Sequence, residues 1–132
     1  QRATFICASF DETLAMLQVG DVVYCDPPYD GTFSGYHTDG FTEDDQYHLA
    51  SVLEYRSSEG HPVIVSNSDT SLIRSLYRNF THHYIKAKRS IGVSAGESKS
   101  ATEIIAVSGA RCWVGFDPSC GVDSSAVYEV RV

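Results

Sequence analysis

The feature that most constrains the fold is an apolar run from Val22 to Cys25 that ends abruptly in Asp26-Pro27-Pro28-Tyr29. β-branched and aromatic residues favour a strand, whereas proline has no backbone N–H and cannot continue the hydrogen-bond ladder of a sheet. The sequence therefore predicts a buried strand whose carboxyl end displays Asp26 and Tyr29. Because ligands of open α/β sheets bind at the carboxyl ends of strands, we expect the functional site there.

Strands and helices are predicted to alternate along the chain. The expected strands cover residues 5–10, 22–25, 63–65, 84–88, 103–107 and 126–130, and the expected helices cover residues 11–18, 43–58 and about 71–80. Thr42 is expected to cap the second of these helices, and Asp69 or Thr70 the third. Residues 92–100, rich in Gly and Ser, are predicted to form a hairpin loop. The predicted fold class is α/β: part of a Rossmann-like sheet, mostly parallel with an antiparallel end.

Size and composition indicate a single globular unit. The chain has 132 residues, 42% of them hydrophobic, which is enough to bury a core. No apolar run approaches the roughly 18 residues of a membrane span and no signal-peptide pattern opens the chain, so we expect no membrane partner and a cytoplasmic location. The cysteines form no C-x-x-C pair, which favours reduced thiols over a disulfide or a zinc site. They are Cys7, Cys25, Cys112 and Cys120.

Charge is divided unevenly along the chain. The formal net charge is −7, yet seven of the ten basic residues and only two acidic residues lie between Ser71 and Arg111. That segment therefore carries +5 and the remainder −12. A basic second half can face the phosphates of DNA. A solvated charged surface explains the same distribution equally well.

The tetrapeptide after the first apolar run suits methyl transfer to an exocyclic amine. The lone pair of such an amine is delocalised into its ring, which makes the nitrogen a poor nucleophile. Two acceptors, the Asp26 carboxylate and the Pro27 carbonyl, could take both N–H bonds and stabilise the positive charge that develops on the nitrogen. Pro28 ends the strand, and the Tyr29 ring could stack on a base turned out of the duplex.

With these residues, the chain resembles the DNA adenine methyltransferase family, which transfers a methyl group from S-adenosylmethionine to the N6 of adenine in short duplex sites such as GATC. The resemblance extends from about Phe5 to Val107 and is carried by five blocks in the family's order. These are Phe5–Phe10, Val23–Tyr29, Gly35–Thr42, Pro62–Thr70 and Lys88–Ile91.

The resemblance implies roles for particular residues. Ser9 and Phe10 would lie beside the adenine ring of the cofactor, with Asp26 at the same strand end, and the segment Lys88-Arg89-Ser90 would begin near the flipped target. The cofactor would be S-adenosyl-L-methionine and the partner duplex DNA inside a bacterial cell, whether the protein is encoded by the bacterium or by a phage. Nothing in the sequence indicates a metal requirement; the pair His82-His83 has no partner at metal-ligand spacing.

Family members also carry a glycine-rich cofactor loop and a target-recognition region ahead of the tetrapeptide. No Gly-x-Gly or Phe-x-Gly element precedes residue 20 here, and the chain begins with Gln. We therefore expect residues 1–110 to be the catalytic-pocket half of the methyltransferase domain and residues 111–132 to be a tail of unknown role. The partner of this half would be a missing amino-terminal half, or a second copy bound through an exposed sheet edge.

Several further residues are candidates with competing explanations. Tyr36 and His37, with Phe33, lie in a loop of Gly, Ser, Thr and Asp, where aromatic side chains could close over a base or could be incidental. Asn67 and Asp69 follow a buried strand and could shape the pocket and contact the substrate, although capping explains Asp69 equally well.

Two other functions compete with adenine methylation. The absent glycine-rich loop favours a truncated or degenerate homologue that acts as a non-catalytic binding or structural module. Methyltransferases of cytosine N4 or of a protein glutamine more often carry Ser or Asn where this chain has Asp26.

Overall fold

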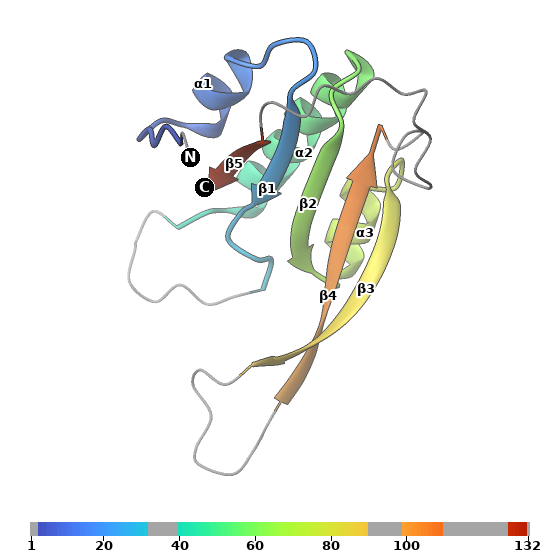
Figure 1. The fold of residues 1–132 in the computed structure, drawn as a ribbon. Helices are drawn as coiled ribbons and strands as arrows, with labels where there is room; N and C mark the ends of the chain where they lie inside the picture. The colour runs from blue at the N-terminus through green and yellow to red at the C-terminus, as the bar shows by residue number, and fades with distance from the viewer. Residues whose placement is uncertain (1–2, 32–39, 90–98, 110–126, 132) are drawn as a thin grey trace.

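The computed structural model describes residues 3–31, 40–89, 99–109 and 127–131, which form a five-stranded sheet with helices (Figure 1). The strands are β1 (Val22–Asp26), β2 (Val63–Ser68), β3 (Thr81–Arg89), β4 (Lys99–Ser108) and β5 (Val127–Arg131). The helices are α1 (Phe10–Ala15), α2 (Glu43–Ser58) and α3 (Ser71–Leu76). Their alternation confirms the predicted α/β class.

The sheet has the strand order β3-β4-β2-β1-β5. β1 is parallel to both β2 and β5, while β4 is antiparallel to both β2 and β3. Among the described strands, β4 is therefore the only one antiparallel to the rest. This confirms the expectation of a mostly parallel sheet with an antiparallel end, and it brings the carboxyl ends of β1, β2 and β5 to one edge.

Helix α2 begins and ends where the sequence predicts. The Thr42 side chain accepts from the backbone N–H of Asp45, and the Asp45 side chain accepts in return from the backbone N–H of Thr42, which completes a capping box. Glu43, Asp44 and Asp45 place negative charge in the first turn, where the helix dipole favours it. Just beyond the other end, Gly60 has a φ of +100°, a left-handed conformation that glycine adopts without strain.

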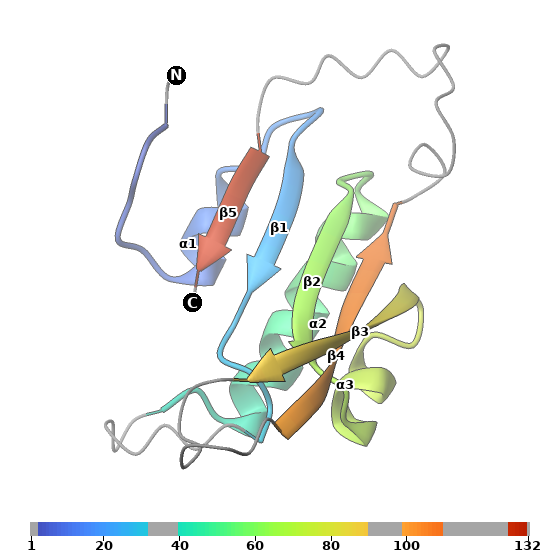
Figure 2. The ribbon, with the colours of Figure 1, turned by 60° about the horizontal axis from the view of Figure 1, so that its bottom comes forward.

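The core lies between the sheet and the helices α2 and α3; both helices lie behind the sheet in Figure 1, and Figure 2 shows α2 behind β2. Burial alternates along β1, so Val23 and Cys25 face the core while Tyr24 and Asp26 are half-buried on the other face. From α2, Leu49 and Leu53 are fully buried. Burying each such side chain contributes roughly 1.5–3 kcal/mol.

The strand predicted over residues 5–10 is wrong. Residues 3–9 have no regular secondary structure, and Ser9 instead caps α1, with Phe5 95% exposed. A strand needs a neighbour with which to form its ladder, and residues 3–9 pair with none of the five described strands. The helix predicted to reach residue 80 ends earlier, at Leu76, although Tyr77 and Phe80 are buried as their spacing indicated.

Strand β5 comes from the segment that the sequence left without a role. It pairs in parallel with the whole of β1, from Val22 opposite Val127 to Asp26 opposite Arg131. This edge of β1 is therefore paired within this structure. Self-association through that edge would require β5 to leave it.

Candidate active site

Asp26 is the last residue of β1 and lies at the edge where the parallel strands end. Its Oδ1 accepts a 2.6 Å hydrogen bond from the hydroxyl of Ser66 on β2, a side chain that is only 2% exposed. The Ser66 hydroxyl also lies 3.5 Å from the hydroxyl of Tyr24. The half-buried Asp26 carboxylate is thus oriented by a buried donor from the neighbouring strand.

Tyr29 is half-buried at the same edge. Its hydroxyl donates to Oε2 of Glu103 on β4 over 3.4 Å. Burial raises the pKa of the Tyr29 phenol; a hydrogen bond with Ser66 opposes the rise, and the carboxylates of Glu103 and Asp26 add to it. The phenol therefore stays neutral at physiological pH.

The loop after Asp26 is held by side chains from other elements. The carbonyl of Pro28 accepts from Nε2 of Gln46 at 2.8 Å, and the backbone N–H of Asp30 donates to Oδ1 of Asn67 at 2.9 Å. The Asp30 carboxylate in turn accepts from the Thr70 hydroxyl at 2.6 Å. Gly31 follows with a φ of +73°, a left-handed conformation that glycine adopts without strain.

Cys25 precedes Asp26 but points to the opposite face, into the core. Burial, followed by the charge of Asp26, raises the pKa of the Cys25 thiol to about 12. A nucleophilic cysteine needs a thiolate, so Cys25 is inert at neutral pH. Cys7 and Cys25 are both free thiols, exposed and buried respectively, while Cys112 and Cys120 lie outside the described residues.

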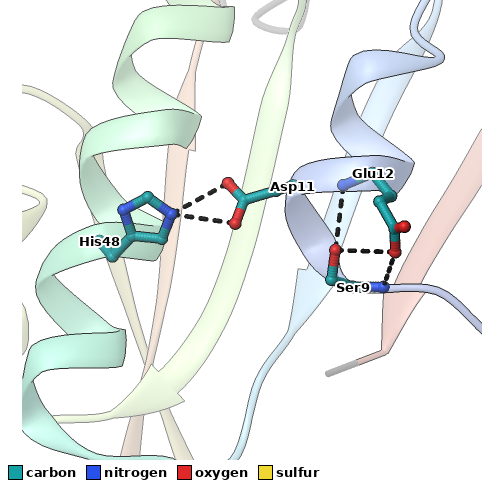
Figure 3. A network of polar contacts seen from close by, with 4 residues as sticks. All are labelled: Ser9, Asp11, Glu12 and His48. Atoms are coloured by element: carbon teal, nitrogen blue, oxygen red, sulfur yellow. Dashed lines mark hydrogen bonds and ion pairs between the residues drawn. The ribbon is translucent and has the colours of Figure 1, made fainter.

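The residues expected near the cofactor lie around α1. Ser9 and Glu12 form a capping box at the start of α1, and Asp11 accepts from His48 on α2 at 3.0 Å (Figure 3). The Phe10 ring is half-buried, with its centroid 5.3 Å from that of His48 and 6.4 Å from that of Phe41. None of the hydrogen bonds or ring contacts described for Ser9 and Phe10 joins them to Asp26.

The residues expected at the substrate or DNA do not lie together in the described part of the structure. Asn67 is fully buried, with its amide oxygen occupied by the backbone N–H groups of Asp30 and Ser68. Lys88 and Arg89 lie on β3, the outermost strand of the sheet, opposite Ser100 and Lys99. Tyr36, His37 and Ser90, together with Phe33, lie outside the described residues.

Sequence reasoning missed Gln46, Ser66 and Glu103. Gln46 did leave a signal, because it continues the buried stripe of Leu49, Ala50 and Leu53 at helical spacing and is itself only 3% exposed. A polar residue on such a stripe indicates a specific partner in the core. Glu103 left no comparable signal.

No group of three or more potential metal ligands is present among residues 3–31, 40–89, 99–109 and 127–131. None of the helices in the described part of the chain combines the length and apolar character that crossing a bilayer requires.

Comparison with known proteins gives consistent results. The family model of the D12 class N6 adenine-specific DNA methyltransferases matches residues 1–91. The Retron Ec67 DNA adenine methylase of Escherichia coli is 99% identical over the whole of this chain, which covers 46% of that protein. The DNA adenine methylase of Vibrio cholerae (strain O395) is 42% identical over 113 residues, or 81% of this chain and 41% of that protein. The corresponding protein of Escherichia coli K12 is 38% identical over 112 residues, or 81% of this chain and 40% of that protein. The chain thus spans less than half the length of these relatives.

Proposed function

The chain belongs to the D12 class N6 adenine-specific DNA methyltransferase family, and from this premise we propose that it supplies the amine-binding half of an active site. The reaction is transfer of a methyl group from S-adenosylmethionine to the N6 amine of adenine in duplex DNA. Asp26 carries the proposal, because it is a carboxylate held at the carboxyl end of β1 by a buried hydroxyl from β2.

Asp26 and the Pro27 carbonyl accept the two N–H bonds of the adenine amine. These contacts favour a tetrahedral nitrogen whose lone pair is no longer shared with the ring, and they stabilise the positive charge that develops during transfer. Ser66 occupies Oδ1 of Asp26, which fixes the plane of the carboxylate and leaves Oδ2 to receive the amine. Held groups of this kind need no reorganisation at the moment of reaction.

Tyr29 stacks on the target base once the base is turned out of the duplex. Such stacking is worth roughly 1–3 kcal/mol per base, which offsets an extrusion cost of a few kcal/mol. The contact between the Tyr29 hydroxyl and Glu103 supports this role, because it restrains the ring from its far end.

The second half of the chain faces the DNA backbone. Arg78, which precedes β3, and Lys86 on β3 are exposed, and Lys88 and Arg89 follow on this edge strand. Ser90, Tyr36 and His37 complete the proposed DNA and substrate contacts. Because such contacts neutralise phosphates and release counterions, the affinity for DNA should fall steeply as the salt concentration rises.

The cofactor supplies an electrophilic methyl group when bound. Among the described residues, the half-buried ring of Phe10 beside Ser9 offers an apolar surface that fits the adenine part of S-adenosylmethionine. No glycine-rich turn for its methionine part precedes residue 20. We therefore assign that part of the site to the portion of the full-length protein that this chain does not span.

Replacement of Asp26 tests the proposed function. In the full-length methylase, Asp26→Ala should lower turnover at least about a hundredfold, because losing one charged acceptor in the transition state costs about 3 kcal/mol. Cofactor affinity, measured by calorimetry, should remain within about twofold, since Asp26 acts on the amine. A variant that keeps more than a tenth of the wild-type turnover would refute the assignment.

A further inference from the structure

The loop that follows Asp26 has few backbone donors of its own. Pro27 and Pro28 have no backbone N–H, so Tyr29 and Asp30 carry the loop's first available donors. The loop nevertheless has to present the Pro27 carbonyl and the Tyr29 ring in fixed positions if it is to bind an amine and a base. Contacts with other elements therefore supply hydrogen bonds that the loop does not make within itself.

Gln46 provides the first external contact. It lies on the buried face of α2 and is only 3% exposed, among leucines and an alanine. Its Nε2 donates to the Pro28 carbonyl at 2.8 Å, and its Oε1 accepts from Nδ2 of Asn67 at 3.2 Å. Burying an amide is unfavourable unless its hydrogen bonds are made, and here both ends are satisfied.

Asn67 provides the second contact. This β2 side chain is fully buried, and its Oδ1 accepts from the backbone N–H of Asp30 at 2.9 Å and from that of Ser68 at 2.8 Å. Thr70, the N-cap of α3, adds a hydrogen bond to the Asp30 carboxylate. The residues on both sides of Tyr29 are thus tied to α2, to β2 and to the start of α3.

The hydrogen bonds through the two amides all run in one direction. The N–H of Asp30 donates to Asn67, Asn67 donates to Gln46, and Gln46 donates to the Pro28 carbonyl. The circuit starts and ends on the same loop, two residues apart. Hydrogen bonds linked in this way polarise one another, and a loop closed through two buried amides has little freedom to shift.

We propose that Gln46 and Asn67 are positioning residues for methyl transfer, which set the position of the Pro27 carbonyl and of the Tyr29 ring against the target base. The inference rests on the proposed function and deepens it. Neither side chain touches the substrate; both act through the loop. Displacing reacting groups by about 1 Å can lower a rate about a hundredfold, so loss of the circuit should reduce turnover far more than binding.

The test is Gln46→Met in the full-length methylase, a change of similar size that removes the donor to Pro28. We expect kcat to fall at least tenfold while the KM values for DNA and for S-adenosylmethionine change by less than about threefold. Val52→Ala, on the same helix and partly buried against the core, is the control, because it weakens packing without touching the loop. A Gln46→Met variant with wild-type kcat, or with a loss matched by Val52→Ala, overturns the proposal.

Gln46→Glu gives a readout that a structural role alone would not move. A neutral carboxyl can still donate to Pro28 and accept from Asn67, whereas a carboxylate cannot donate. Burial raises the pKa of a carboxyl group. The kcat of Gln46→Glu divided by that of the wild type should therefore rise at least threefold from pH 8 to pH 6, while the same ratio for Gln46→Met stays flat. Asp30, Asp11 and His48 are present in every variant, and the ratio to the wild type is taken at each pH.

The outcomes distinguish failure of the positioning role from failure of the proposed function. If Asp26→Ala is inactive while Gln46→Met turns over normally, the positioning role is wrong and the proposed function stands. If Asp26→Ala retains activity, the proposed function fails, and the positioning role fails with it. If Gln46→Met does not fold, a flat pH ratio for Gln46→Glu still overturns the positioning role.

Discussion

Replacing Ser66 by alanine should slow methyl transfer without abolishing it. The Ser66 hydroxyl is 2.6 Å from Oδ1 of Asp26. A hydrogen bond to a charged group contributes roughly 1.5–3 kcal/mol. Only the part of this energy that differs between ground state and transition state affects kcat. Because each 1.4 kcal/mol is a factor of ten, we expect Ser66→Ala in the full-length methylase to lower kcat between about threefold and a hundredfold.

The assay is the single-turnover methylation rate with a labelled methyl group and saturating duplex. Ser57→Ala is the matched control, because it removes the same atom from a hydroxyl that pairs with Ser108 rather than with Asp26. The Ser66→Ala variant should retain its affinity for S-adenosylmethionine. A rate within twofold of the Ser57→Ala rate would show that Ser66 does not orient the carboxylate.

Three further outcomes are expected. Tyr77 is 1% exposed and its hydroxyl has no hydrogen-bond partner among the described residues, so Tyr77→Phe should raise the free energy of unfolding by about 1–3 kcal/mol in urea titrations. The control Tyr47→Phe, at an exposed position, should change it by less than about 0.5 kcal/mol. No gain in stability for Tyr77→Phe would contradict this prediction. In the folded protein at pH 8, iodoacetamide should label the exposed Cys7 and leave the buried Cys25 unmodified. The Cys25 pKa rises from 9.0 to about 12 on folding, so as pH rises the thiol ionises first in the unfolded state. The contribution of Cys25 to the free energy of unfolding should therefore decline as pH rises above about 9, and Cys25→Ala should remove that decline. The chain alone should neither methylate DNA nor bind S-adenosylmethionine with micromolar affinity in calorimetry, because it has no glycine-rich turn before residue 20. Micromolar binding together with turnover would show that another segment of the chain forms the cofactor site.

The sequence predicted the local features of the fold well. The cap at Thr42, the stripe of Leu49 and Leu53, and the proline stop after Asp26 each depend on residues a few positions apart, and all three are present. The strand expected over residues 5–10 failed for a non-local reason. Its apolar residues suit a strand, but a strand forms only with a partner for its ladder, and residues 5–9 pair with none of the strands β1 to β5.

In the candidate site too, the sequence predicted local features but not long-range contacts. The placement of Asp26 at a strand end followed from the sequence, whereas the contacts around it did not. Gln46 reaches Pro28 across 18 positions of the chain, and Tyr29 reaches Glu103 across 74. No periodicity links residues at such separations, so these partners required the three-dimensional structure.

The pairing of β5 with β1 also constrains when this protein can fold. About 100 residues separate the two strands, and at roughly 5–20 residues per second a ribosome needs about 5–20 s to make them. Within this chain, the strand that ends in Asp26 lacks its β5 partner throughout that interval, and an unpaired strand edge is a template for association with other chains. Slower translation between residues 27 and 126 should therefore increase aggregation of nascent chains, and a chaperone that covers the β1 edge should reduce it.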